Sequence, residues 1–298
     1  MHLVGSKTSM KSTYLTNLLL LVVAVLLVWL MTETNTSSSV ITISDSIDPT
    51  QVTEIEIQRR EQQTIQLQQD QQWQLVQPVK ARANQTRIKL LLSLLEQPVQ
   101  TPILVTDNTD LAEFGLAQPN LTLLFNQQKF AFGDTESLSG QRYIQHNQQI
   151  YLIHDDISPL LGASASSFVD NRLLDPISQI QSIQLPALHD DNAQSQTSAL
   201  SIYQQDNNWL ASPDNYNQDQ LITLIQNWQQ AYAMQVVINA DIDLADDKPV
   251  VLIELADNTQ RKFVVSHNND SLTLTDPQLQ LQYQFPAQII NALFSIND

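Results

Sequence analysis

An uninterrupted apolar segment near the N-terminus constrains this chain more than any other feature. No polar side chain occurs from Leu18 to Met31, and Tyr14 and Leu15 lengthen the stretch to residues 14–31, with only Thr16 and Asn17 as polar interruptions. As a helix that rises ~1.5 Å per residue, this segment would measure roughly 27 Å, close to the thickness of a membrane's hydrocarbon core. The sequence therefore predicts a transmembrane anchor over residues 14–31.

A cleaved secretory signal peptide is the alternative, because its apolar part can have a similar length. Cleavage needs small residues before the cut, but Trp29, Leu30 and Met31 are bulky and no Ala-x-Ala sequence follows them. The pattern favours an uncleaved signal-anchor.

The charges around this segment predict its orientation. Lys7 and Lys11 precede it, whereas Glu33 follows it. Because basic residues stay on the cytoplasmic side, we expect residues 1–13 in the cytoplasm and the larger C-terminal part outside it. Residues 32–48 are rich in Ser, Thr and acidic side chains, a composition that predicts a short polar tether.

The charge and the missing cysteines exclude several functions. All 31 acidic residues lie at or after Glu33, against only 14 basic residues in the whole chain. Such a surface repels phosphate backbones, so nucleic acid is not an expected partner. The absence of cysteine rules out disulfides, thiol catalysis and zinc–thiolate sites.

Alternating apolar and polar residues predict strands in the first half of the chain. The pattern is clear over Val52–Ile57, continues through Trp73–Leu75, and returns in pairs of strands over residues 121–132 and 143–153. Between these groups, Asn84 is placed to cap an amphipathic helix.

The second half repeats this order. Ile180–Leu185 corresponds to Val52–Ile57, and Asp206-Asn-Asn-Trp209 corresponds to Asp70-Gln-Gln-Trp73. An amphipathic helix around residues 221–228 and further alternating strands follow. The shared order predicts a duplication, with chance agreement between alternating patterns as the alternative.

Together these patterns predict an α+β fold. A transmembrane helix is followed by two tandem, similar, mainly antiparallel β units, each with one central helix. The first unit is expected over residues 49–165, a linker over residues 166–178 and the second unit over residues 179–298. Arg172 in the linker is expected to pair with a local carboxylate.

Several short stretches, together with the apolar helix, carry a resemblance to a known family. They are Val52–Ile57, Trp73–Pro78, Asp110–Pro119, Phe132-Gly133, Arg142–Ile144 and Phe168–Leu174. Over roughly residues 15–185 the chain resembles bacterial proteins of the domain of unknown function 4340 family. The resemblance implies a protein anchored in the bacterial inner membrane, with its C-terminal domain in the periplasm or another extracytoplasmic space. Some relatives are encoded beside subunits of ABC-type transporters, which implies envelope or membrane proteins as partners.

Two histidine clusters are candidates for a metal site or a catalytic base. They are His154-Asp155-Asp156 and His189-Asp190-Asp191. Metal ligation needs three or four convergent groups, and no His-x-x-x-His spacing accompanies either cluster. Asp155 or Asp156 as the cap of a short helix over Ile157–Leu161 is the favoured interpretation.

Three further features are weighed against ordinary structural roles. The acidic cluster Asp241–Asp247 lacks the glycine and terminal glutamate of a calcium loop, so a solvated loop is favoured. Trp73 and Trp209 could stack on sugars, but their place in alternating strands favours packing. The chain has only 5 glycines, too dispersed for a phosphate-binding loop, so no nucleotide is expected.

No residue is therefore predicted to be catalytic, to bind a cofactor or to ligate a metal, and the chain is not expected to be an enzyme. The leading hypothesis is an accessory or scaffold subunit of an envelope complex that acts by contact with other proteins. A module that binds envelope glycan or a small solute is the alternative.

Overall fold

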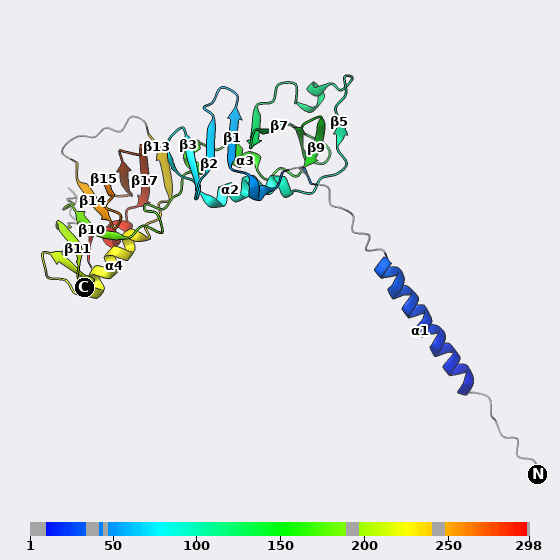
Figure 1. The fold of residues 1–298 in the computed structure, drawn as a ribbon, viewed down its shortest axis with the longest axis horizontal. Coiled ribbons are helices and arrows are strands. Elements are labelled where there is room, and N and C mark those ends of the chain that lie inside the picture. The colour runs from blue at the N-terminus through cyan, green and yellow to red at the C-terminus, as the bar shows by residue number, and fades with distance from the viewer. Residues whose placement is uncertain (1–9, 34–41, 44–46, 189–196, 240–247, 297–298) are drawn as a thin grey trace, which may run out of the picture. The chain divides into compact units, whose positions relative to one another are not determined.

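The computed structural model describes residues 10–33, 42–43, 47–188, 197–239 and 248–296 (Figure 1). The chain divides into two compact units, residues 1–41 and residues 42–298. The described part of the first unit is one helix, α1 (Met10–Glu33).

The predicted transmembrane anchor over residues 14–31 is contradicted. Among the residues that the structure describes, no helix is both long and apolar enough to cross a membrane. The uninterrupted apolar run of α1, from Leu18 to Met31, measures only roughly 21 Å as a helix, and lengthening it brings in the polar residues Thr16 and Asn17.

The segments on either side of the apolar run are described only in part. Residues 1–9 of the predicted cytoplasmic segment, and residues 34–41 and 44–46 of the predicted tether, lie outside the described residues. Near the end of the tether, Ile43 is only 1% exposed and belongs to the hydrophobic core of the second unit. The second unit thus begins at Thr42.

The second unit is mostly antiparallel β structure in two sheets with few helices, so the predicted α+β class is wrong. Residue alternation of period two dominates its sequence, and its helices are short. They are α2 (Gln85–Leu92), α3 (Ser158–Leu161), α4 (Gln218–Gln229) and α5 (Ile289–Phe294), with the 3-10 turns η1 (Pro49–Gln51), η2 (Ser93–Glu96), η3 (Leu111–Phe114) and η4 (Ala165–Phe168).

Sheet 1 has nine strands in the order β4-β3-β2-β1-β6-β7-β8-β9-β5. All of its pairings are antiparallel. The strands are β1 (Glu54–Arg59), β2 (Ile65–Gln69), β3 (Trp73–Gln77), β4 (Ala81–Arg82), β5 (Ile103–Leu104), β6 (Leu121–Phe125), β7 (Gln128–Thr135), β8 (Arg142–His146) and β9 (Gln149–Ile153).

Sheet 2 has eight strands in the order β12-β11-β10-β14-β15-β16-β17-β13, again all antiparallel. Its strands are β10 (Ile180–Leu185), β11 (Leu200–Gln205), β12 (Asn208–Ser212), β13 (Gln235–Ile238), β14 (Val250–Leu255), β15 (Gln260–His267), β16 (Ser271–Asp276) and β17 (Leu281–Pro286).

The two sheets have the same topology. In each, three strands are followed by a helix, a strand that pairs at the far end of the sheet, and a meander of four strands. β3 therefore corresponds to β12, α2 to α4, and β5 to β13. The one difference is β4, which extends sheet 1 beyond β3 and has no counterpart in sheet 2.

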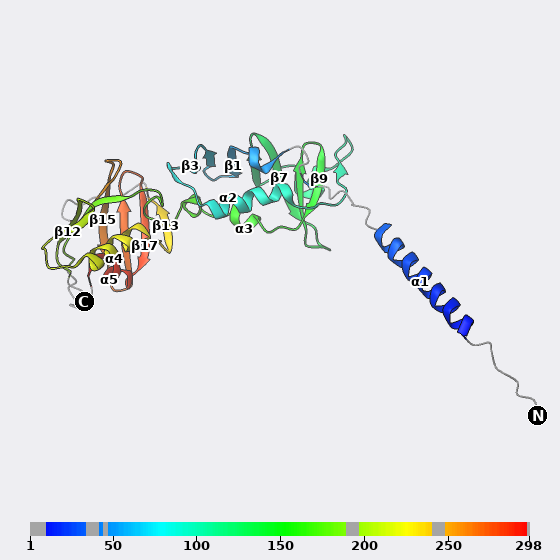
Figure 2. The same cartoon turned by 60° about the horizontal axis from the view of Figure 1, so that its bottom comes forward.

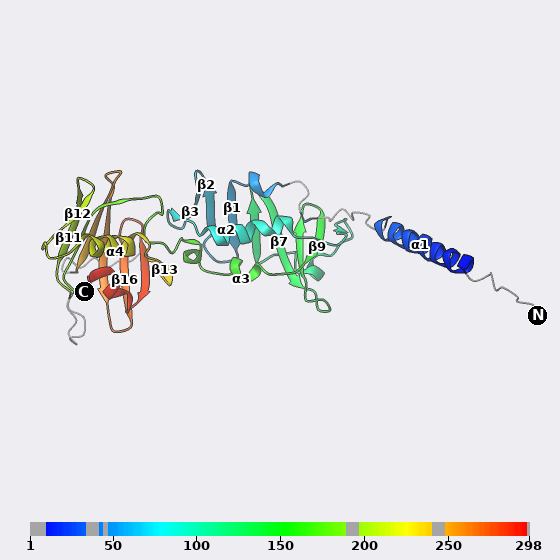
Figure 3. The same ribbon diagram turned by 90° about the horizontal axis from the view of Figure 1, so that it is seen from below.

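Each sheet buries one face under its helices. Figure 2 shows α2 and α4 lying along their sheets, and Figure 3 shows the same helices from below. On α4, the side chains of Leu221, Leu224, Ile225 and Trp228 are buried at helical spacing. Trp228 is fully buried, and its indole N–H donates to the carbonyl of Leu293, 2.6 Å away.

The segment between the two sheets is hydrogen-bonded to both. The amide of Asn84 donates to the carbonyl of Phe168 (2.7 Å) on the side of sheet 1. The amide of Leu173 donates to the carbonyl of Ala231 (3.0 Å) on the side of sheet 2. Residues 168–173 thus bridge the two sheets through backbone hydrogen bonds.

Candidate functional site

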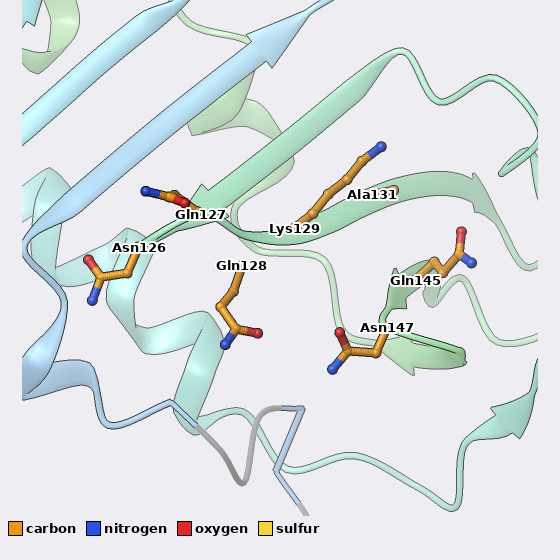
Figure 4. A pocket seen from close by; sticks show the side chains of 7 residues that line it. All are labelled: Asn126, Gln127, Gln128, Lys129, Ala131, Gln145 and Asn147. Carbon is orange, nitrogen blue, oxygen red and sulfur yellow. The ribbon is translucent and has the colours of Figure 1, made fainter.

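A hollow in the described surface lies on sheet 1. It has a volume of about 520 Å³ and is open to solvent. We call it the amide hollow because most of its lining side chains are amides: Asn126, Gln127, Gln128, Lys129, Ala131, Gln145 and Asn147. Figure 4 shows that they project from two neighbouring hairpins, the one that joins β6 to β7 and the one that joins β8 to β9.

A tight turn between β6 and β7 forms one wall of the amide hollow. Asn126 and Gln127 both have positive φ angles, 45° and 71°, as two-residue hairpin turns require. The side-chain oxygen of Asn126 accepts hydrogen bonds from the amides of Thr53 (2.9 Å) and Glu54 (3.0 Å). Its NH₂ group donates to the carbonyl of Gln51 (2.8 Å). Asn126 therefore fixes this wall to the start of β1 and has a structural role.

A buried histidine supports the other wall. The ring of His146 is stacked on Phe130, with centroids 4.2 Å apart. Its Nδ1 lies 3.0 Å from the carbonyl oxygen of Lys129, and its Nε2 lies 3.1 Å from the side-chain nitrogen of Asn147. A carbonyl can only accept, so Nδ1 carries the proton and Nε2 accepts from Asn147. This arrangement orients Asn147 at the hollow.

Four side chains of the amide hollow are available to a partner. Gln127, Gln128 and Lys129 are exposed, and Gln145 is half-buried. None of the four side chains has a hydrogen bond or ion pair to the described part of the chain. Each Gln offers both donors and acceptors, whereas Lys129 offers donors and the only charge. The hollow is therefore suited to binding uncharged polar groups and holds no pair of groups for acid–base or nucleophilic chemistry.

A second hollow, of about 570 Å³, lies between α4 and α5, but three of its amide side chains already have structural roles. Asn217 and Gln220 form the capping box at the start of α4. The side chain of Asn227 donates to the carbonyl of Ala292, 2.9 Å away. The amide hollow is thus the stronger candidate.

The cluster His154-Asp155-Asp156 does not form a metal site. Asp155 forms an ion pair with Arg142 and accepts a hydrogen bond from the amide of Ser158 (2.9 Å) at the start of α3. Burial alone would raise the pKa of Asp155, but these hydrogen bonds and the charge of Arg142 lower it below its ordinary value. Within the described ranges, no group of three or more His, Cys, Asp or Glu residues could hold a metal ion.

The two tryptophans of the repeated turns do not provide an open aromatic surface. Trp73 is only 5% exposed and packs in the core. Trp209 is partly buried against the same core. Two other sequence candidates, His189–Asp191 and Asp241–Asp247, lie outside the described residues.

Sequence reasoning missed the amide hollow. Its residues are separated in the chain, and glutamines are so frequent here that those at the hollow do not stand out. The Asn-Gln pairs at the two hairpin turns, residues 126–127 and 147–148, were the available signal, because asparagine readily adopts the positive φ angles found in such turns.

A family model described as a domain of unknown function, DUF4340, matches residues 73–248. The match confirms the resemblance seen in the sequence, although it begins and ends later than the residues 15–185 on which that resemblance was based. No curated protein and no solved structure matches this chain.

Proposed function

Because this chain belongs to the DUF4340 family of domains of unknown function, we propose its role from its surface: a non-enzymatic accessory or scaffold subunit of an envelope complex. It would act by contact with a partner protein. The observation that carries this proposal is the amide hollow, where Gln127, Gln128 and Gln145 present donors and acceptors that no other described side chain occupies.

The chemistry of the amide hollow favours a polar protein surface as its ligand. A peptide group has one donor and one acceptor, and a glutamine amide can satisfy both. The side chains stand on two paired strands, so little backbone ordering is needed when a partner binds. The hollow is open, as expected for contact with a broad surface rather than for enclosing a small molecule.

The envelope location and an ABC-type transporter as partner rest on the family resemblance alone. They are part of the proposal because relatives are encoded beside transporter subunits. No contact within the described residues bears on either of them.

Crosslinking followed by co-purification of the full chain tests this function. We expect a specific partner with the natural protein and its loss with the double variant Gln128→Ala/Gln145→Ala. The matched control is Gln62→Ala/Gln226→Ala, which removes two exposed amides elsewhere. Recovery of no partner, or equal recovery with both double variants, would refute the proposal.

A module that binds envelope glycan or a small solute is the second candidate. The same amides favour it, because hydroxyl groups also need both a donor and an acceptor. Substituting Trp73 cannot test this idea, since that residue is in the core. Titration with a panel of envelope glycan fragments should instead show binding that Gln128→Ala weakens, and a panel without any binding would eliminate this candidate.

A further inference from the structure

The two sheets differ at one edge. Sheet 1 ends in β4, which pairs with β3, whereas sheet 2 ends in β12. Within the described part of the chain, no strand pairs with β12 on the side away from β11. Because β12 corresponds to β3, sheet 1 shows what a covered version of this edge looks like.

In sheet 1 the chain covers its own edge. Leu75 is paired with Ala81 across β3 and β4, and the carbonyl of Trp73 accepts a hydrogen bond from the amide of Ala83 (3.0 Å). The side chain of Leu75 packs in the core and is 0% exposed. Ala81 and Ala83 are themselves buried. The covering strand is thus short, with small residues at alternate positions.

Sheet 2 lacks this strand because its connection is shorter. In sheet 1, residues 79–83 separate Pro78 from the helix cap Asn84. In sheet 2, only residues 214–216 separate Pro213 from the cap Asn217. Three residues reach the helix but leave no length for a strand that returns along the edge.

Part of the open edge is occupied by a side chain instead. The amide of Trp209 donates to the side-chain oxygen of Gln218 (3.1 Å), and the carbonyl of Trp209 accepts from the NH₂ group of Gln218. The backbone groups of Trp209 therefore point away from β11. By the alternation of an antiparallel strand, those of Ala211 point the same way. Ala211 is only half-buried, unlike its fully buried counterpart Leu75.

The charge around this edge favours a basic partner. No Lys or Arg occurs between Arg172 and Lys248, a stretch that includes β10, β11, β12 and α4. Asp206, Asp214 and Asp219 lie within this stretch and close to β12 in the chain. A second copy of this chain would bring the same acidic edge against itself, so self-pairing is disfavoured.

We propose that the open edge of β12 binds an extended, basic segment of another protein, which adds to sheet 2 as β4 adds to sheet 1. Backbone hydrogen bonds to Ala211 hold the segment, and small side chains at alternate positions let it lie close to the edge. This site is on the other sheet from the amide hollow, so the two proposals can fail separately.

A peptide with the sequence of residues 79–84, Val-Lys-Ala-Arg-Ala-Asn, is a suitable probe because it copies the strand that covers sheet 1 and carries two positive charges. Fluorescence anisotropy of the labelled peptide with the full chain should show saturable binding. Ala211→Pro should weaken it about tenfold or more, because proline removes the outward N–H and obstructs an added strand. An edge strand tolerates proline where its N–H faces solvent.

A second variant should act in the opposite direction. Gln218→Ala frees the backbone groups of Trp209, and one or two additional hydrogen bonds should tighten peptide binding about fivefold. Gln226→Ala, the same substitution at an exposed position of α4, should leave the affinity unchanged. Gln128→Ala in the amide hollow should also have no effect.

Hydrogen exchange supplies a measurement that does not depend on a variant. In the natural protein, the peptide should slow exchange of the Ala211 amide, whereas a peptide with N-methylated backbone should not. Equal binding to Ala211→Pro and to the natural protein, or weaker binding to Gln218→Ala, would overturn the proposal. A dimer in sedimentation that Ala211→Pro dissociates would also overturn it, in favour of pairing between two copies.

Discussion

Gly133 on β7 leaves no room for a side chain. A Cβ atom there would lie 2.1 Å from the carbonyl oxygen of Phe114 and 2.9 Å from Cγ of Leu116. The backbone of η3 would have to move, so Gly133→Ala should lower the free energy of unfolding by about 2–3 kcal/mol. Urea denaturation measures this loss.

Gly162 gives the matched control. A Cβ atom at this position would have its nearest neighbour, the carbonyl oxygen of Ser158, at 3.4 Å. Its φ angle is −80°, which alanine adopts without strain. Gly162→Ala should therefore change the free energy of unfolding by no more than about 0.5 kcal/mol. Similar losses for both variants would show that the close approach at Gly133 does not constrain the fold.

Asp155 should make stability depend on pH. Burial by itself would raise its pKa, but the hydrogen bond from Ser158 and the charge of Arg142 lower it overall. The carboxylate therefore contributes stability that is fully present above the unfolded pKa of about 4 and is lost as the pH falls through the lower folded pKa. Asp155→Asn should be about 1–2 kcal/mol less stable at pH 7.

Urea denaturation measures the difference in the free energy of unfolding between the natural protein and Asp155→Asn. This difference should shrink as the pH is lowered below about 4. Asp156→Asn is the control, because Asp156 is exposed and its carboxylate lies 3.3 Å from the ring of His154, which is also exposed. A pH-independent difference for Asp155→Asn would contradict an electrostatic role.

Residue roles in this chain could be predicted from the sequence only where they are local. Asp155 or Asp156 was predicted to cap a short helix because both directly precede Ile157–Leu161, and in the structure Asp155 accepts from the amide of Ser158. The ion pair of Asp155 with Arg142 depends on the pairing of β8 with β9, and no local sequence pattern predicts that pairing. Arg172, in contrast, was expected to bind a local carboxylate, yet the recorded ion pairs there are those of Arg82 with Asp170 and Asp175.

Among the elements, α4 begins at a capping box formed by Asn217 and Gln220. The side chain of Asn217 accepts a hydrogen bond from the amide of Gln220 (3.0 Å), and the side chain of Gln220 accepts one from the amide of Asn217 (3.0 Å). Asn217→Ala should lower the free energy of unfolding by about 1 kcal/mol, because the amide of Gln220 in the first turn of α4 loses its side-chain acceptor. Thermal or urea unfolding measures the loss.

Asn215→Ala is the matched substitution, since Asn215 is exposed and lies outside the cap. It should be neutral within about 0.5 kcal/mol. Equal effects of both variants would mean that the capping box does not stabilise α4.

Strands with clear alternation could be predicted, but short edge strands could not. β4 and β5 have two residues each, too few for any period to be visible. A bulge also hid part of the correspondence between sheets. The register of β2 and β3 shifts between Gln66 and Leu67, which places an extra residue in β3 and accounts for the one-residue gap between the Trp73 and Trp209 segments.

Over the whole molecule, the repeated order of elements was visible in the sequence, while the closing strands were not. β5 follows α2 and β13 follows α4 in the chain, and each pairs with the last strand at the far end of its sheet. No local sequence pattern predicts this long-range contact. The prediction of a membrane span in α1 was wrong for a different reason. Residues 14–31 reach the length of a span only if the polar residues Thr16 and Asn17 are included with the apolar run from Leu18 to Met31.

Arg82 connects the two sheets through the segment between them. Its Nη2 donates to the carbonyl of Arg172 (2.7 Å), and its Nε lies 3.4 Å from Asp170. Between these two partners, the carbonyl of Asn171 accepts a hydrogen bond from the amide of Ala233 (2.9 Å), which shortly precedes β13 of sheet 2. Because residues 42–298 form one compact unit, removing the side chain of Arg82 should destabilise both sheets.

Arg82→Ala should therefore lower the free energy of unfolding by about 2 kcal/mol, since it leaves partly buried acceptors without their partner. Lys80→Ala, which removes an exposed positive charge nearby, should have almost no effect. Hydrogen exchange on both proteins locates the change. Faster exchange is expected both in β3 of sheet 1 and in β13 of sheet 2, because residues 168–173, which Arg82 holds in place, are hydrogen-bonded to both sheets. Acceleration confined to sheet 1 would mean that the two sheets unfold independently despite their shared hydrogen bonds.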